Sequence, residues 1–203
     1  MVATGSSTIP GVLREAAGAF GDRAAYVEGE RTLSFAGLHA AVREVAAGYV
    51  ALGLEPGDRV VLWAPNSIDW VVAALAVSYA GGTLVPANSR YTGHEVAELA
   101  DRTAARLVVV ADGFLGRAQI ADLRAASSLA SVAEVVDLAE LDRIVERGRE
   151  VDATLVEARA DAVTAEDVAD ILFTSGTTGR PKGAMSAHRQ AVGVARAWGG
   201  LGG

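Results

Sequence analysis

The sequence predicts an α/β protein with a mostly parallel sheet that is covered by helices on both faces. Apolar runs typical of buried strands lie at residues 59–64, 83–86 and 106–111. Segments with helical periodicity separate these runs, and the strands recur about every 24 residues, as βαβ units do. This alternation indicates that the strands run parallel within one sheet.

A helix and a hairpin are expected before this alternation begins. Thr8 and Pro10 are typical of the start of a helix. Two short runs, 24–28 and 31–34, follow that helix, and a Gly-Glu pair separates them. We therefore expect these two runs to form a β-hairpin.

Each of the next three helices is expected to follow a residue that can cap its N-terminus. A side-chain hydroxyl at this position accepts a hydrogen bond from a backbone N–H of the first turn. These helices are expected to end near residues 52, 79 and 101. The three capping residues are Ser34, Ser67 and Thr92.

The pattern is weaker between residues 114 and 160, where helical pieces surround one expected strand at 134–138. We expect residues 167–173 to form a last buried strand that leads directly into a polar loop. A final helix is expected at 188–198.

The composition is that of a globular protein and excludes several kinds of site. Half of the residues are apolar, the net charge is −7, and the positive charges are scattered, so no nucleic-acid partner is expected. The absence of cysteine excludes disulfides, thiolate metal sites and a cysteine nucleophile. The three histidines, His39, His94 and His188, lie far apart and lack zinc-ligand spacing.

The N-terminus does not have the basic segment and apolar run of a secretory signal, so a soluble cytoplasmic protein is expected. Residues 70–89 form a run without charge, and this run is about as long as a membrane-spanning helix. Gly81, Gly82 and Pro86 interrupt this run, so a helix, a turn and a strand are expected there and no transmembrane segment. The sequence leaves a homo-oligomer open.

The polar loop has the residues of a cradle for polyphosphate. Its three glycines allow positive φ angles and close approach to a ligand, and backbone N–H groups can converge on anionic oxygens. Four hydroxyl side chains and a lysine add donors and a positive charge, and a proline stiffens the turn. In order, the loop consists of Thr174, Ser175, Gly176, Thr177, Thr178, Gly179, Arg180, Pro181, Lys182 and Gly183.

This loop differs from the common P-loop of nucleotide hydrolases. That pattern has glycine directly before the lysine and Ser or Thr directly after it, whereas here Pro181 precedes Lys182 and Gly183 follows. No strongly helical segment begins at once, so a helix dipole would contribute less to phosphate binding. A flexible surface loop is the alternative, because Ser, Thr and Gly are common in loops.

The order of the loop residues carries a family resemblance. The run FTSGTTGRPKG at 173–183 resembles, without a gap, the signature of the AMP-binding superfamily, which includes acyl-CoA synthetases, nonribosomal peptide adenylation domains and luciferases. The likeness spans most of residues 8–198, and its Pro-Asn-Ser and Asn-x-Arg-Tyr-Thr pieces are most similar to acyl-CoA synthetases. Further segments that resemble the family lie at 33–35, 57–60, 65–67, 80–86 and 88–92.

Residues 170–190 are most similar to a narrower group, the actinobacterial CoA ligases that activate the two-ring propionate left from steroid breakdown. Family members usually have Thr before the histidine of this segment and Asn two residues after it. This chain has Ala187 and Gln190 there, a departure that resembles the steroid-related group. The resemblance thus implies a fatty acid or a steroid-derived propionate as the substrate.

The resemblance implies a two-step reaction that uses ATP, Mg²⁺ and coenzyme A. The carboxylate of a small-molecule acid attacks the α-phosphorus of ATP, pyrophosphate leaves, and an acyl-adenylate forms. The thiol of coenzyme A then attacks the acyl-adenylate, which forms the thioester and releases AMP. Because the cofactor supplies the nucleophilic thiol, the enzyme needs no cysteine of its own.

The resemblance also implies roles for the loop residues. Lys182 would be the catalytic residue, because its charge stabilises the β- and γ-phosphates as pyrophosphate leaves. Thr174 would help to hold Mg²⁺. His188 would lie near the acyl or coenzyme A path, or else be a cap or a partly buried polar residue at the start of the last helix. The expected cofactor-binding set is Thr174, Ser175, Gly176, Thr177, Thr178, Gly179, Arg180, Pro181, Lys182, Gly183 and His188.

By resemblance, residues 1–203 form the N-terminal portion of the AMP-binding large domain, because family members are considerably longer. The rest of that domain and a mobile C-terminal domain would be absent, so the 203-residue chain alone is expected to be inactive. Two alternatives stay open. One is a truncated, non-catalytic chain with residual nucleotide binding, and the other is a peptide-synthetase adenylation domain.

Overall fold

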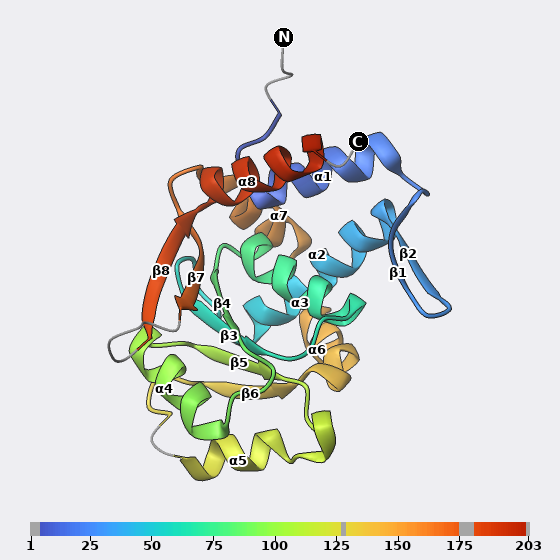
Figure 1. Ribbon diagram of the computed structural model, residues 1–203. Helices are drawn as coiled ribbons and strands as arrows, with labels where there is room; N and C mark the ends of the chain where they lie inside the picture. Colours follow the sequence, from blue (N-terminus) through green and yellow to red (C-terminus); the bar gives the residue numbers. More distant parts are fainter. Residues whose placement is uncertain (1–4, 127–128, 175–180, 202–203) are drawn as a thin grey trace.

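A computed structural model of the chain describes residues 5–126, 129–174 and 181–201 (Figure 1). The predicted helices and strands of the first half are present, with small shifts at their ends. The helices are α1 (Ile9–Phe20), α2 (Phe35–Ala51), α3 (Ile68–Tyr79), α4 (Gly93–Thr103), α5 (Gln119–Ala126), α6 (Leu141–Gly148), α7 (Ala153–Ala162) and α8 (His188–Leu201). The strands are β1 (Ala24–Glu28), β2 (Arg31–Ser34), β3 (Arg59–Trp63), β4 (Thr83–Ala87), β5 (Leu107–Val110), β6 (Glu134–Asp137), β7 (Val168–Thr174) and β8 (Lys182–Ala187).

One sheet contains strands in the order β6-β5-β3-β4-β7-β8, whereas β1 and β2 form the predicted hairpin. The central strand β3 pairs in parallel with β4 on one side and with β5 on the other, so that Val60 lies opposite both Leu84 and Leu107. β6 and β7 continue the parallel pairing, and β8 pairs antiparallel with β7 at the edge. The predicted mostly parallel sheet is therefore confirmed.

Helices cover both faces of this sheet, as predicted. Successive side chains of a strand point to opposite faces. On β3, Val60 and Leu62 therefore enter one buried cluster, and Val61 and Trp63 enter another. The first cluster includes side chains of α1, α2, α3, α6 and α7, and the second includes side chains of α4 and α5. Figure 1 shows α4 and α5 on the lower side of the sheet and α2 and α3 on the upper side.

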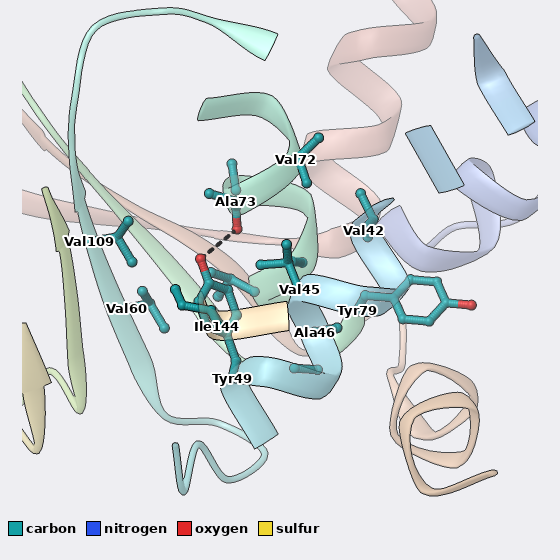
Figure 2. Close-up of a cluster of buried hydrophobic side chains, with 14 of the residues drawn as sticks. Val42, Val45, Ala46, Tyr49, Val60, Val72, Ala73, Tyr79, Val109 and Ile144 are labelled. Atoms are coloured by element: carbon teal, nitrogen blue, oxygen red, sulfur yellow. Dashed lines mark hydrogen bonds between the residues drawn. The ribbon is translucent and has the colours of Figure 1, made fainter. Parts of the chain in front are cut away.

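In the first cluster, α2 and α6 pack with their backbones in contact. A Cβ atom added to Gly48 would lie 2.3 Å from Cγ2 of Ile144, and one added to Gly148 would lie 2.5 Å from the nitrogen of Gly48. Real Cβ atoms do not approach other atoms so closely, so this contact requires both glycines. Figure 2 shows Ile144 beside Tyr49, whose hydroxyl donates to the carbonyl of Ala73 on α3 at 3.4 Å.

The predicted N-terminal caps are also present. The hydroxyls of Thr8, Ser34, Ser67 and Thr92 each accept a hydrogen bond from the backbone N–H three residues later. At α4, the Glu95 carboxylate also accepts a hydrogen bond from the N–H of Thr92 at 2.7 Å, which completes a capping box. The first turn of α4 is thus fixed from both sides.

The prediction of a last buried strand at 167–173 is wrong in two respects. The strand β7 is only partly buried, and Leu172 is 47% exposed. It is also not the last strand, because Lys182–Ala187 form β8. The sequence of β8, KGAMSA, contains no β-branched or aromatic residue, so pairing with β7 determines this strand rather than local propensity.

The uncharged segment at 70–89 has the predicted arrangement. It forms most of α3, a turn with positive φ at Gly81, and β4. Within the described ranges, no helix combines the length and the apolarity that crossing a membrane requires.

Candidate phosphate-binding site

The polar loop predicted to bind phosphate joins β7 to β8. Thr174 at the end of β7 lies opposite Lys182 at the start of β8, and both residues are exposed. The described ends show that a β-hairpin carries this loop, in agreement with the expected minor role of a helix dipole. The loop residues outside the described part are Ser175, Gly176, Thr177, Thr178, Gly179 and Arg180.

Gly183 has a packing role in this hairpin. It lies opposite Phe173, and an added Cβ atom would be 3.0 Å from Cγ2 of Ile171 and 3.2 Å from Cζ of Phe173. The ring of Phe173 therefore occupies the space beside Gly183 and packs against the second cluster, with Ile171. Glycine at this position allows the aromatic ring to lie across the hairpin.

Lys182 is the only lysine in the chain, although the chain has 18 Lys and Arg residues. A lysine ammonium is a compact charge on a flexible stem, whereas arginine binds through a rigid planar fork. Phosphate-binding loops use lysine in this way, as a point charge. The exposed position of Lys182 at the end of the loop fits such a role.

Arg102 on α4, which no sequence pattern indicated, contacts the base of the loop. Its guanidinium donates a hydrogen bond to the carbonyl of Pro181 at 2.8 Å, and its Cζ lies 4.8 Å from the centre of the Phe173 ring. The local sequence shows only a basic residue in the last turn of a helix. Its partners lie far along the chain, so no local pattern could reveal this contact.

His188 lies at the other end of β8 from Lys182, and the six-residue strand separates them by roughly 20 Å. It is 2% exposed, and its Nδ1 accepts a hydrogen bond from the N–H of Ile9 at 3.3 Å. Burial lowers the pKa of the imidazole below its ordinary value, while the charge of Asp167 acts in the opposite direction. These contacts fit the structural interpretation, in which His188 joins α1 to the start of α8.

The described residues contain no cluster of acidic or histidine side chains that could hold a metal ion by itself. Thr174, the predicted Mg²⁺ ligand, has an exposed position at the end of β7. Mg²⁺ that is bound by substrate phosphates keeps several waters and needs few protein ligands. A single hydroxyl such as that of Thr174 therefore fits an ion that arrives with a nucleotide.

The sequence profile of a family described as AMP-binding enzyme matches residues 13–201. This match includes nearly all of the chain, with the polar loop and both of its flanking strands. The chain belongs to the AMP-binding enzyme family. The predicted resemblance is thereby confirmed, and the roles of individual loop residues stay predictions.

Curated members of the AMP-binding family support a narrower likeness. A methyl-dioxo-octahydroindenyl-propanoyl:CoA ligase of Rhodococcus jostii is 43% identical over an alignment that covers 95% of this chain and 40% of the relative. The ligase of the same name from Mycobacterium tuberculosis is 42% identical over 94% of this chain and 38% of its own length. The long-chain-fatty-acid–CoA ligase FadD15 of M. tuberculosis is 32% identical over 70% of this chain and 24% of its own length.

Solved structures confirm the predicted fold class. A fatty acyl CoA synthetase of M. tuberculosis has a TM-score of 0.81 and 26% identity, over 96% of this chain and 37% of that structure. The N-terminal domain of FACL13 from the same organism has a TM-score of 0.76 and 29% identity. The match covers 89% of this chain and 44% of that structure. The chain thus has the fold of the N-terminal part of these enzymes, and it spans about 40% of the curated relatives first named.

Proposed function

We propose that the chain is the N-terminal portion of the large domain of an ATP-dependent acyl-CoA ligase. The observation that carries the proposal is the AMP-binding family match, in which the signature loop is carried by β7 and β8 with Thr174 and Lys182 at its two ends. The three curated relatives described above are CoA ligases by name. The proposed reaction forms an acyl-adenylate from a carboxylic acid and ATP, and then a thioester with coenzyme A in the cytoplasm.

The proposed task of the loop is to bind the β- and γ-phosphates of ATP. Fixed N–H and hydroxyl donors can stabilise the leaving pyrophosphate without reorganisation, and the ammonium of Lys182 adds a positive charge. Mg²⁺, when bound, neutralises charge on the phosphate oxygens, and Thr174 is its proposed protein ligand. The other members of the proposed cradle are Ser175, Gly176, Thr177, Thr178, Gly179, Arg180, Pro181 and Gly183.

The substrate that we favour is a steroid-derived propionate on a two-ring skeleton. The relatives at 43% and 42% identity are named for a propanoyl group on a fused two-ring dione, whereas the fatty-acid ligase is 32% identical. Ala187 and Gln190 depart from the usual family pattern in the same direction. A long-chain fatty acid is the second candidate.

The substitution Lys182→Ala tests the assigned role in the complete protein. We expect acid-dependent ATP–pyrophosphate exchange to fall on the order of 10²–10³-fold, because a charge aimed at the leaving pyrophosphate is lost. Lys182→Arg should restore only part of the rate, since its planar fork differs from a point charge.

The exchange assay is run with the two-ring propionate and with long-chain fatty acids side by side. If Lys182→Ala exchanges pyrophosphate at the rate of the wild type, the proposed role of the lysine is contradicted. A wild-type protein that exchanges with neither class of acid would contradict the proposed function itself.

A further inference from the structure

A cation from α4 contacts both ends of the phosphate-binding loop. Arg102 donates a hydrogen bond to the carbonyl of Pro181 at 2.8 Å, and its guanidinium lies 4.8 Å from the centre of the Phe173 ring. Phe173 directly precedes Thr174, and Pro181 directly precedes Lys182. One side chain therefore touches the hairpin where the loop leaves it and where the loop returns.

The position of Arg102 is itself fixed by α4. The capping box of Thr92 and Glu95 sets the first turn of this helix, and the apolar face of the helix is buried in the second cluster. Glu98, one turn before Arg102, lies 3.8 Å from its guanidinium, a pairing that stabilises helices. A cation in the last turn is also favoured by the helix dipole. Arg102 thus reaches the loop from a rigid support, and its side chain is only 33% exposed.

The hydrogen bond acts on the peptide group from which Lys182 begins. The carbonyl of Pro181 and the N–H of Lys182 belong to one planar peptide unit, so a donor that holds the carbonyl also orients the N–H. The proline ring fixes φ on the other side of that carbonyl. A charged donor makes this hydrogen bond stronger than a neutral one, and the Phe173 ring adds a cation–π contact.

We propose that Arg102 is a positioning residue, which sets the geometry of Thr174 and Lys182 through Phe173 and Pro181. The inference rests on the proposed function, since it adds to that site a residue outside the signature. Arg102 acts through the hairpin and does not itself bind the nucleotide. Its removal should therefore change both the structure at Lys182 and the use of ATP.

The single lysine provides a direct structural test in the 203-residue chain. Labelling with nitrogen-15 lysine gives one backbone amide signal in NMR spectra, that of Lys182, which is bonded to the Pro181 carbonyl carbon. In Arg102→Met this signal should move, and its hydrogen exchange should accelerate about tenfold or more, because the peptide group is no longer held. Arg102→Gln, which keeps a hydrogen-bond donor and adds no second lysine, should move the signal less.

The matched control is Arg124→Met, which removes the same charge from an exposed position on α5. It should leave the Lys182 signal in place. If Arg102→Met also leaves the signal and its exchange unchanged, the positioning role is overturned. If Arg102→Met does not fold, Arg102→Gln decides by the same criterion, because it adds no second lysine.

The kinetic test uses ATP–pyrophosphate exchange by the complete protein. Arg102→Met should lower kcat/KM for ATP by about 10- to 100-fold, the effect expected when a reacting group is misplaced, with the KM for the acid unchanged.

A moved Lys182 signal with normal kinetics would overturn the inference. Loss of exchange with an unmoved signal would overturn it too, because Arg102 would then contact the nucleotide directly. An inactive wild type would instead count against the proposed function, while the NMR result still decides whether Arg102 positions Lys182.

Discussion

His188 is an example of a single residue whose surroundings decide its role. Its sequence position next to the signature loop suggested a place near the acyl or coenzyme A path. In the fold, its Nδ1 accepts a hydrogen bond from α1, and its own N–H donates to the carbonyl of Asp167 at 3.0 Å. These contacts support a structural role between α1 and α8, and the place of His188 in the cofactor-binding set stays a prediction.

This burial predicts a pH dependence of stability. The folded-state pKa of His188 lies below its ordinary value of 6.5, so below about pH 6.5 the unfolded chain binds a proton that the folded chain does not. The free energy of unfolding should then fall as the pH decreases from 7.5 to 5.5. In His188→Asn, where Oδ1 can still accept from Ile9, this decrease should be smaller. Urea unfolding at the two pH values measures both slopes.

His39 needs attention in that comparison, because burial lowers its pKa as well and its contribution has the same sign. It is present in both proteins, so the difference between the two slopes isolates His188. His94→Asn, at an exposed histidine, is the control for the loss of one imidazole from the chain. Equal slopes in wild type and His188→Asn would contradict the prediction.

Among the elements, the contact of α2 with α6 depends on two glycines as well as on apolar side chains. Gly48 and Gly148 let the two backbones meet, and Ile144 fills the space beside them. A helix-interior glycine ordinarily destabilises a helix by about 1 kcal/mol relative to alanine. Here the tertiary contact reverses that preference.

The substitution Gly48→Ala should lower the free energy of unfolding by about 1–3 kcal/mol, because its methyl group would overlap Ile144. Gly18→Ala on α1 is the matched control, since no atom lies within 4 Å of its added Cβ. It should be neutral or stabilise by up to about 1 kcal/mol. Denaturant unfolding of the two variants and the wild type measures the difference, and a neutral Gly48→Ala would show that α6 can move away at little cost.

The hairpin of β7 and β8 is the element on which the proposed site depends. β7 could be predicted because its residues are apolar, although its partial exposure could not. β8 has none of the residues that favour strands, and it forms because it can pair with β7. The geometry of Thr174 and Lys182 is thus a property of the pairing.

At the scale of the whole molecule, the chain spans about 40% of the length of the two propanoyl:CoA ligases named above, so the proposed activity belongs to the complete protein. The loop is proposed to supply donors for the phosphates. Within its described residues, the chain offers no side-chain cluster to hold a metal ion by itself. We therefore predict that residues 1–203 alone bind ATP weakly and form no acyl-CoA. The test is an assay for thioester formation by the purified chain, at a verified mass of 20.8 kDa, with the complete protein as the control. Thioester formation by the pure chain would contradict the prediction.

The sequence by itself determined the class of the fold, the order of most elements, the helix caps and the family. These features depend on residues close together in the chain: a strand or helix shows its own periodicity, a cap acts within one turn, and the signature loop is continuous. For that reason, the sheet of parallel strands and the loop at 174–183 could be predicted before any contact was known.

Only the tertiary structure decided which residues support the loop. The strand β8, the contact of Arg102 with Pro181, the packing of Gly183 beside Phe173 and the burial of His188 all depend on which segments meet. The sequence separation of Arg102 and Pro181 is 79 residues, and that of Ile9 and His188 is 179. No local pattern specifies such pairs, because their interaction exists only once the sheet and the helices α1 and α4 have packed together.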